Sequence, residues 1–468
     1  MLKRSRKRAL LASASSVLLA TAPFATAQVQ SAPTVPAPPA APEGYDAALW
    51  KRAWVLHHAA ILVDTHVDTT SRVLDQGFDM GLRAKDGHVD LPRAADGGLD
   101  AVFYSIYVDS RFYGDEAAMF ANAPPSLQDD WPRPSEAGPA NGSARRALMM
   151  IDGLMRTVER YPDRMSLCTS VHDLRAAVAA DHHAALMGIE GGHAIEGDLG
   201  LLRQFHRLGV RYMTLTHTNH NEFADSCAPV EPRWGGLNRL GAKVVREMNR
   251  LGVIVDVSHV SDATFRDVVH LTTAPVICSH SSLRSLCAHP RNITDDMLRA
   301  LAMNGGAVMI NFNCGFLDPE YAKLSSGRTA TRRIQEKAAR EKFAAGSPEL
   351  ATALINLDAR FPAVERPELK QLMAHVLRAI EIAGPDHVGM GSDFDGVPCV
   401  PKGMDDATFL PRLTYELLAA GQSEVTVRKV LGENLLRVFA AVEQVALAQS
   451  ALPPLTNDPR TDREPLPR

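Results

Sequence analysis

The feature that most constrains the fold is an alternation of short apolar runs with stretches of helical periodicity. Helical segments carry apolar residues three and four positions apart on one face. Continuous apolar strands alternating with such helices indicate a parallel sheet covered on both faces, and eight units favour closure into a (β/α)8 TIM-type barrel, an α/β fold. An open doubly wound sheet is the structural alternative. The eight runs lie at 61–68, 99–108, 185–191, 212–217, 254–259, 274–281, 306–312 and 387–394.

Several of the predicted helices end at a glycine that directly precedes the next strand. Examples are Gly209, Gly252 and Gly305, and glycine readily takes the left-handed conformation that ends a helix. The pattern is interrupted by an irregular stretch at 109–144 and by a long charged insertion at 317–365, which is predicted in part as a solvent-exposed helix. That insertion is a candidate for a cover over the barrel mouth or for a subunit contact.

The two ends of the chain are expected to lie outside the barrel. Residues 1–27 combine a basic start, an apolar stretch and an Ala-Thr-Ala sequence, which is typical of a cleavable secretory signal peptide rather than of a membrane anchor. Residues 28–44 form a Pro/Ala-rich linker, residues 45–448 the barrel, and residues 449–468 a polar tail without a lipid-anchor signal. We therefore expect an exported protein, periplasmic or secreted, with no stable membrane anchor after cleavage.

Net charge bears on the class of partner, and cysteine content bears on the disulfides. The formal net charge of −4 includes five basic residues and no acids within the first 27, so the remainder is near −9, which argues against a nucleic-acid partner. Six cysteines are too sparse for a disulfide scaffold. We expect Cys278 and Cys399 to be packed among apolar residues, and Cys287 with Cys314 is the first pair to examine for a disulfide.

Metal-ligand side chains stand at the ends of four predicted strands. His66 and Asp68 end the first strand, Glu190 the third, His259 the fifth and His280 the sixth. Active sites of such barrels are built at the C-terminal ends of the strands, so these five residues are expected to converge. A carboxylate among histidines can bridge two metal ions, and the N/O ligand set suits zinc, although manganese or cobalt would also fit. Glu190 is the natural bridge, with water shared by two ions as the nucleophile.

Two further strand ends supply the other parts of a hydrolytic site. His217 follows the fourth strand and Asp393 the eighth. His217 is placed to stabilise the oxyanion formed by attack on a carbonyl, and Asp393 to relay a proton to the leaving amine. The alternatives are a packed strand histidine and a structural hydrogen-bond acceptor, respectively.

These motifs, in this order, resemble those of the membrane (renal) dipeptidase family, zinc enzymes related to the amidohydrolase barrels. The resemblance implies two Zn²⁺ ions per subunit, bridged by Glu190, with His66 and Asp68 on one ion and His259 and His280 on the other. The matching segments are His-x-Asp at 66–68, Gly-Ile-Glu-Gly-Gly-His at 188–193, Thr-Leu-Thr-His-Thr-Asn at 214–219, Asp-Val-Ser-His-Val-Ser at 256–261, Ser-His-Ser-Ser at 279–282 and Gly-Ser-Asp-Phe-Asp-Gly at 391–396.

The resemblance also implies how substrate is held. His217 would contact the scissile carbonyl, Asp393 would bind the substrate amine and assist proton transfer, and Arg291 would bind the C-terminal carboxylate, as a guanidinium fork can. Binding both ends of the substrate would restrict the site to dipeptides. Members of this family also accept a D-residue at the C-terminal position, and some hydrolyse a β-lactam ring. The sequence leaves both extensions open for this chain.

Three departures from the family pattern affect the pocket, the anchor and the quaternary state. Residues 311–316 read Asn-Phe-Asn-Cys-Gly-Phe, where the family has tyrosines, so the side-chain preference is open. The insertion at 317–365 is longer than the family leads us to expect, which leaves a homodimer open. The lipid anchor of the mammalian relatives is not expected here.

Two competing functions remain at this point. Another metal-dependent amidohydrolase, such as a deacetylase or a lactonase, would share the barrel and the His-x-Asp start, but many of these bridge their metals with a carboxylated lysine, whereas the strand ends here offer Glu190 and no lysine. A non-catalytic zinc-binding or peptide-binding protein is the second, and it is disfavoured because an open two-metal site with water normally performs chemistry.

Overall fold

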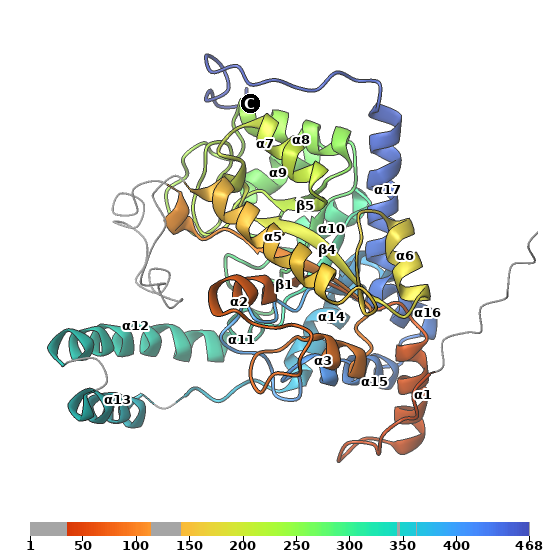
Figure 1. The fold of residues 1–468 in the computed structure, drawn as a ribbon, viewed down its shortest axis with the longest axis vertical. Helices are drawn as coiled ribbons and strands as arrows, with labels where there is room; N and C mark the ends of the chain where they lie inside the picture. The colour runs from red at the N-terminus through yellow and green to blue at the C-terminus, as the bar shows by residue number, and fades with distance from the viewer. Residues whose placement is uncertain (1–34, 114–141, 344–346, 362, 468) are drawn as a thin grey trace, which may run out of the picture. The chain divides into compact units, whose positions relative to one another are not determined.

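Among the described residues, nine parallel strands form one sheet, and eight of them close into a barrel. Figure 1 shows the strands surrounded by helices. The structure is a computed structural model that describes residues 35–113, 142–343, 347–361 and 363–467. The strand order is β2-β1-β9-β8-β7-β6-β5-β4-β3, and the pairing of β2 with β4 closes the ring, so that β3 adds to β4 outside it. The strands are β1 Val63–Val67, β2 Ala101–Tyr107, β3 Met165–Leu167, β4 His183–Glu190, β5 Val210–Thr214, β6 Ile254–Asp256, β7 Ile277–Cys278, β8 Ala307–Ile310 and β9 Val388–Met390.

The closed ring confirms the predicted barrel, and the open-sheet alternative is wrong. Each of the eight predicted runs contains or overlaps one barrel strand. The short strand β3 has no counterpart among the predicted runs, because a strand of three residues shows no usable periodicity.

Helices cover the outside of the ring, and none among the described residues is long and apolar enough to span a membrane. The α-helices are α1 Ala47–His58, α2 Thr69–Gln76, α3 Leu91–Asp96, α5 Ser143–Arg160, α6 Val171–Ala179, α7 Leu199–Arg207, α8 Arg239–Leu251, α9 Asp262–Leu271, α10 Asp295–Met303, α11 Cys314–Leu317, α12 Pro319–Lys342, α13 Pro348–Arg360, α14 Leu369–Ala383, α15 Pro411–Ala419, α16 Glu424–Arg428 and α17 Asn434–Gln449. The remaining turns are η1 Ser110–Phe112, η3 Gly192–Ile195, η4 Pro385–His387, η5 Ala407–Phe409 and the π-helical η6 Lys429–Glu433.

The predicted glycine stops are confirmed. Gly209, Gly252 and Gly305 have φ angles of 105°, 81° and 82°, which lie in the region that favours glycine. They follow α7, α8 and α10 and lead almost directly into the next strands. The helix-to-strand connections are therefore short, and the longer strand-to-helix loops gather at the opposite end of the barrel.

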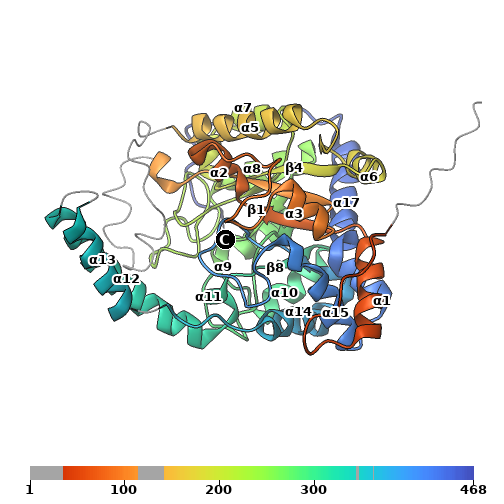
Figure 2. The same cartoon turned by 60° about the horizontal axis from the view of Figure 1, so that its bottom comes forward.

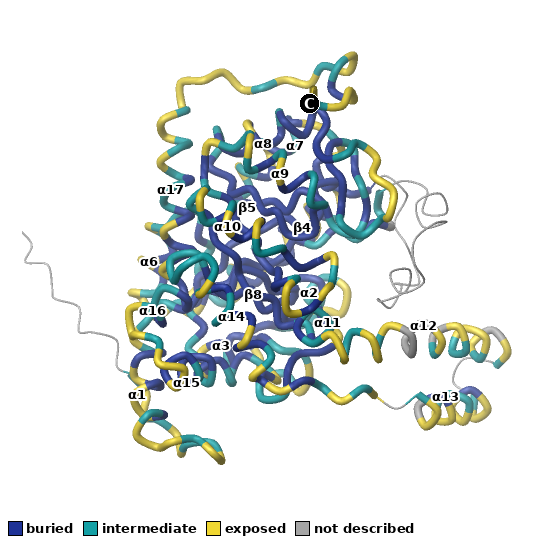
Figure 3. The backbone as a smooth tube through the Cα atoms, turned by 180° about the vertical axis from the view of Figure 1, so that it is seen from behind, coloured by how far each residue is buried: buried dark blue, intermediate teal, exposed yellow. Residues whose placement is uncertain are grey.

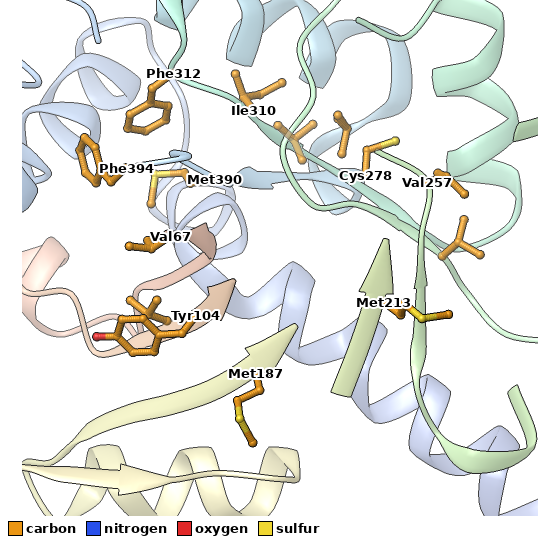
Figure 4. Packing of buried hydrophobic residues seen from close by; sticks show 14 of the residues in the cluster. Val67, Tyr104, Met187, Met213, Val257, Cys278, Ile310, Phe312, Met390 and Phe394 are labelled. Atoms are coloured by element: carbon orange, nitrogen blue, oxygen red, sulfur yellow. The ribbon is translucent and has the colours of Figure 1, made fainter. Parts of the chain in front are cut away.

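Side chains along each strand alternate between two apolar layers. In β2, Ala101 and Phe103 belong to a cluster that includes Leu435 and Phe439 of α17, whereas Tyr104 belongs to the larger cluster between strands and helices. Figure 4 shows part of that larger cluster, and Figure 3 shows the strands in the dark blue of buried residues. One set of strand side chains thus shares a cluster with α17, and the other packs among the surrounding helices.

The charged insertion forms two helices, α12 and α13, that lie side by side (Figure 1) and extend outward from α11 (Figure 2). The prediction of a helix there is confirmed. Their exposed apolar side chains include Leu324, Ile334 and Ile355. Most of the irregular excursion predicted at 109–144 lies outside the described residues, as does the proposed signal peptide at 1–27.

Both segments flanking the barrel make contacts that the sequence analysis did not foresee. In the predicted linker, the carbonyl oxygens of Pro36 and Pro39 accept hydrogen bonds from the indole N–H groups of Trp54 and Trp50 in α1. In the C-terminal tail, Asp462 is buried and pairs with Lys243 of α8 at 2.6 Å. Polar, proline-rich sequence can therefore dock through backbone and side-chain polar groups without an apolar stripe.

The disulfide joins Cys314 to Cys399, with a Cα–Cα distance of 5.6 Å, so the expectations for three cysteines are wrong. Cys287 is a free thiol, and Cys399 is bonded rather than merely packed. The reason is topological: β8 pairs with β9, so the segments that follow these two strands lie together, and the Cys314 N–H donates to the Cys399 carbonyl. Cys278 is buried and free, as expected.

Candidate metal centre

The five predicted metal ligands lie together at the C-terminal ends of the strands. His66 belongs to β1 and Asp68 follows it, Glu190 ends β4, and His259 and His280 follow β6 and β7. All five are buried. His259 has a φ of 65°, a left-handed conformation that is uncommon for residues other than glycine and that recurs at functional sites.

Glu190 lies between two groups of ligand atoms. Its Oε2 is 3.4 Å from His66 Nε2, and its Oε1 is 2.9 Å from His259 Nε2 and 3.1 Å from His280 Nε2. His66 Nε2 is in turn 3.3 Å from Asp68 Oδ2. The two oxygens of one carboxylate therefore face the two predicted ligand pairs, which is the placement that a bridging carboxylate requires.

The spacing fits metal coordination. Four ligands around a tetrahedral zinc with bonds of about 2.0 Å lie about 3.3 Å from one another, and the distances within the cluster range from 2.9 to 3.4 Å. Two of the ligand-type atoms, His66 Nε2 and Asp68 Oδ1, are buried without a hydrogen-bond partner among the described residues. Buried polar atoms are nearly always satisfied, so these orphaned atoms fit a metal ion.

His217 and Asp393 border this cluster at longer range. His217 Nε2 is 3.9 Å from Glu190 Oε1, and Asp393 Oδ1 is 3.9 Å from His66 Nε2. Their ligand atoms still lie within 4.8 Å of those of two cluster members, so either residue could reach an ion. The predicted contact of these two residues with substrate stays a prediction.

The electrostatics of the site favour a cation. Burial would raise the pKa of Glu190, but His66, His217, His259 and His280 outweigh it and hold that pKa well below its usual range. Burial keeps the pKa of His280 well below normal, as it does for His259, so both imidazoles are neutral, the form that binds metals.

His66 and Asp393 shift in the opposite direction. Burial works to lower the pKa of His66, but its Tyr212, Glu190 and Asp68 neighbours raise it well above normal, so positive charge is favoured at this position. Burial raises the pKa of Asp393 to about 7, with Asp68 and Glu190 adding to the effect and His66 opposing it.

Several residues around the site were missed by the sequence analysis. Tyr212 Oη lies 2.7 Å from His66 Nδ1, and Gly188 makes room for that ring, because a Cβ at position 188 would fall 2.0 Å from Tyr212 Cζ. Asn311 donates to Asp393 Oδ2 at 2.8 Å. Asn311 directly follows β8, so the strand-end rule could have found it, whereas Tyr212 lies within a strand and carries no such signal.

Arg291 is buried beside the cluster, with no acidic partner among the residues described. Its Nη2 donates to the His280 carbonyl at 2.9 Å and its Nη1 to Ser281 Oγ at 3.3 Å, while its Nε is without a partner. Phe316 lies under the guanidinium, whose Cζ is 5.4 Å from the ring centroid. A buried, charged group that lacks a counter-ion is costly and fits an anionic ligand.

Comparison with known proteins agrees with this geometry. Residues 50–452 match the model of the membrane dipeptidase family, peptidase family M19. The chain is 37% identical over 381 residues to the dipeptidase aclJ of Aspergillus oryzae, covering 80% of this chain and 74% of that protein. The probable dipeptidase PvdM from Pseudomonas aeruginosa shares the fold, with a TM-score of 0.69, 24% identity and coverage of 86% of this chain and 100% of that one.

A second solved structure carries a ligand. It is a metallopeptidase from Rhodobacter sphaeroides bound to a phosphinate mimic of the dipeptide L-Ala-D-Ala, with a TM-score of 0.63, 28% identity and coverage of 82% of this chain and 99% of that one. The family match spans most of this chain, and the fungal relative exceeds 30% identity. The chain therefore belongs to peptidase family M19, the membrane dipeptidase family, and is a metallo-dipeptidase.

Proposed function

We propose that this metallo-dipeptidase is a binuclear zinc enzyme that hydrolyses the peptide bond of dipeptides by attack of a water shared between two ions. The observation that supports it best is the position of Glu190, whose two oxygens face His66 on one side and His259 with His280 on the other. His66 and Asp68 would hold one ion and His259 and His280 the other. Zinc bound there would activate water for attack and polarise the substrate carbonyl.

The chain's own residues would supply the remaining parts of the reaction. His217 lies on the Oε1 side of Glu190 and has an N–H to donate to the oxyanion that forms at the scissile carbonyl. Asp393 has one oxygen fixed by Asn311 and the other directed toward His66, so its carboxylate is held at the edge of the cluster. From there it would bind the substrate amine and carry a proton to the leaving nitrogen.

The substrate class follows from the buried charge of Arg291. Its guanidinium, free of any acidic partner in the described part of the chain, would bind the C-terminal carboxylate of a dipeptide. With Asp393 holding the amine, a longer peptide would lose one of the two anchors. The ligand of the Rhodobacter sphaeroides relative, a mimic of L-Ala-D-Ala, supports extending the proposal to dipeptides with a C-terminal D-residue.

The place of action is a separate proposal. We propose export to the periplasm or the medium, on the strength of residues 1–27 alone. Fractionation of cells that express the chain with and without these residues checks it, and a fully cytoplasmic distribution in both cases would exclude export. The homodimer stays a prediction, to be checked by light scattering of the purified protein.

The decisive experiment is hydrolysis of a four-member panel by zinc-loaded and chelator-treated protein. The panel holds an L-L dipeptide, an L-D dipeptide, a tripeptide and an N-acetyl amino acid. We expect zinc-dependent cleavage of the dipeptides only. Glu190→Gln should abolish it, because an amide oxygen and nitrogen cannot bridge two cations, while Glu247→Gln, which changes a buried carboxylate on α8, should keep it. Cleavage of the acetylated amino acid with both dipeptides intact would refute the assigned roles of Arg291 and Asp393.

A further inference from the structure

Beneath the ligand cluster lies a second layer of polar side chains that the proposed reaction does not use. Asp256, the last residue of β6, is fully buried, and four hydrogen-bond donors converge on it. Its Oδ1 accepts the backbone N–H groups of Ser258 at 3.0 Å and Ser279 at 2.8 Å. Its Oδ2 accepts the hydroxyls of Thr214 and Ser279, each at 2.5 Å.

The Ser279 hydroxyl connects this carboxylate to a predicted metal ligand. Ser279 Oγ is 2.7 Å from His280 Nδ1, while the Nε2 of the same ring lies 3.1 Å from Glu190 Oε1. Because the hydroxyl has one proton, and the carboxylate takes it at 2.5 Å rather than Ser258 Oγ at 3.5 Å, the Ser279 oxygen is left to accept from His280. The His280 proton then belongs on Nδ1, and Nε2 presents its lone pair to the cluster.

We propose that Asp256 is a positioning residue, which acts through the Ser279 hydroxyl to hold His280 in the tautomer whose Nε2 can bind a metal ion. The inference rests on the proposed metal centre. Partners of this kind, which orient the other nitrogen of a ligating histidine, typically change metal affinity by about 10–100-fold when they are removed. His259 has no comparable support, since its Nδ1 is without a partner within the part of the chain that is described.

The four contacts of Asp256 predict an unusual result for its amide variant. In Asp256→Asn, the amide oxygen must stay on the side of the two backbone N–H groups, which can only donate. The amide N–H₂ then faces the Ser279 oxygen and donates to it, so the hydroxyl proton turns toward His280 Nδ1. This reverses the direction of the relay, places the imidazole proton on Nε2 and opposes metal binding.

The test is zinc affinity of the full-length chain, measured by competition with a chromophoric chelator, with thermal unfolding to establish that each variant is folded. We expect Asp256→Asn to weaken zinc binding about 100-fold and Ser279→Ala about 10-fold. Adding Ser279→Ala to Asp256→Asn should restore affinity to that of Ser279→Ala, because the reversed relay needs the hydroxyl. Thr214→Val is the matched control: it removes a hydroxyl from the same carboxylate oxygen and leaves the relay intact, so its affinity should stay within about threefold of wild type.

Each outcome has a defined meaning. Losses that add in the double variant, or an equal loss in Thr214→Val, would overturn the relay and leave Asp256 a purely structural group. So would affinities of Asp256→Asn and Ser279→Ala that match wild type. If Asp256→Asn does not fold, Ser279→Ala against Thr214→Val still decides the matter. A wild-type chain that binds no zinc would overturn the proposed metal centre together with this inference, whereas wild-type binding with unchanged variants would overturn the inference alone.

Discussion

Replacing Arg291 with methionine should remove the selectivity for a free C-terminal carboxylate. Arg291 is 8% exposed and its guanidinium has no acidic partner among the described residues, so a substrate carboxylate would meet a largely desolvated charge. Charge-assisted hydrogen bonds of this kind contribute about 1.5–3 kcal/mol each. Taking about 3 kcal/mol for the pair, and 1.36 kcal/mol for each factor of ten, we expect kcat/KM for a dipeptide to fall roughly 100-fold.

The assay compares a dipeptide with its C-terminal amide, which lacks the carboxylate. The wild-type enzyme should discriminate between the two by roughly 100-fold, and Arg291→Met should discriminate by less than about threefold, because variant and amide each remove one half of the same contact. Arg284→Met is the control, since Asp262 already pairs with that guanidinium at 2.8 Å. If Arg291→Met lost activity equally on both substrates, Arg291 would be holding the loop around His280 and not the substrate.

Three other predictions concern the stability of the barrel. Burial lowers the pKa of His183 to about 4, so between pH 6.5 and pH 4 only the unfolded chain binds a proton at this residue. The folded state therefore becomes less stable as the pH is lowered through that window. Urea unfolding at pH 7 and at pH 5 gives the decrease in the free energy of unfolding between the two values. This decrease should be about 2 kcal/mol smaller in His183→Gln than in the wild type. Equal decreases in the two proteins would contradict the lowered pKa. The Cys314–Cys399 disulfide joins residues 85 positions apart in the sequence, and its reduction should lower the free energy of unfolding by about 2–4 kcal/mol. Urea unfolding with and without reductant measures this difference. A Cys314→Ser/Cys399→Ser protein is the control, since its unfolding should not change with reductant. Gly188→Ala should lower the free energy of unfolding by about 1–3 kcal/mol and weaken zinc binding, because the new Cβ collides with the Tyr212 ring beneath His66. A variant with the melting temperature and zinc affinity of the wild type would refute that packing.

Much of the fold and the ligand set could be predicted because both depend on local sequence signals. A barrel strand buried on both faces reads as an apolar run, and a polar ligand at its end marks the point where the apolar run stops. His66, Glu190, His259 and His280 each occupy such a position. The convergence of these residues then follows from the fold class alone, since all parallel strands deliver their C-terminal ends to one face.

What could not be predicted depends on the register of neighbouring strands. The barrel order makes β5, β6 and β7 neighbours, but only their register, with Thr214 opposite Asp256 and Asp256 opposite Ile277, brings the hydroxyls of Thr214 and Ser279 to the Asp256 carboxylate. The disulfide depends in the same way on the pairing of β8 with β9. The strand β3 could not be predicted for a different reason, since its three residues are too few to show a pattern.

The layers along the barrel axis explain how a cluster of buried charges is tolerated in this fold. At the start of the strands, apolar residues such as Phe103 pack against Phe439 of α17, and this layer supplies burial energy without any polar group to satisfy. Above this layer lies a set of polar side chains. Tyr212 is hydrogen-bonded to the His66 ring, the Ser279 hydroxyl donates to Asp256, and the same hydroxyl contacts the His280 ring. Among the described residues, His66 Nε2 and Asp68 Oδ1 lack a hydrogen-bond partner, and both lie at the end of β1, where a metal ion can satisfy them. The stability of the barrel and the chemistry at its mouth are therefore carried by different layers, which leaves the ligand layer free to hold a charge arrangement that the rest of the fold does not need.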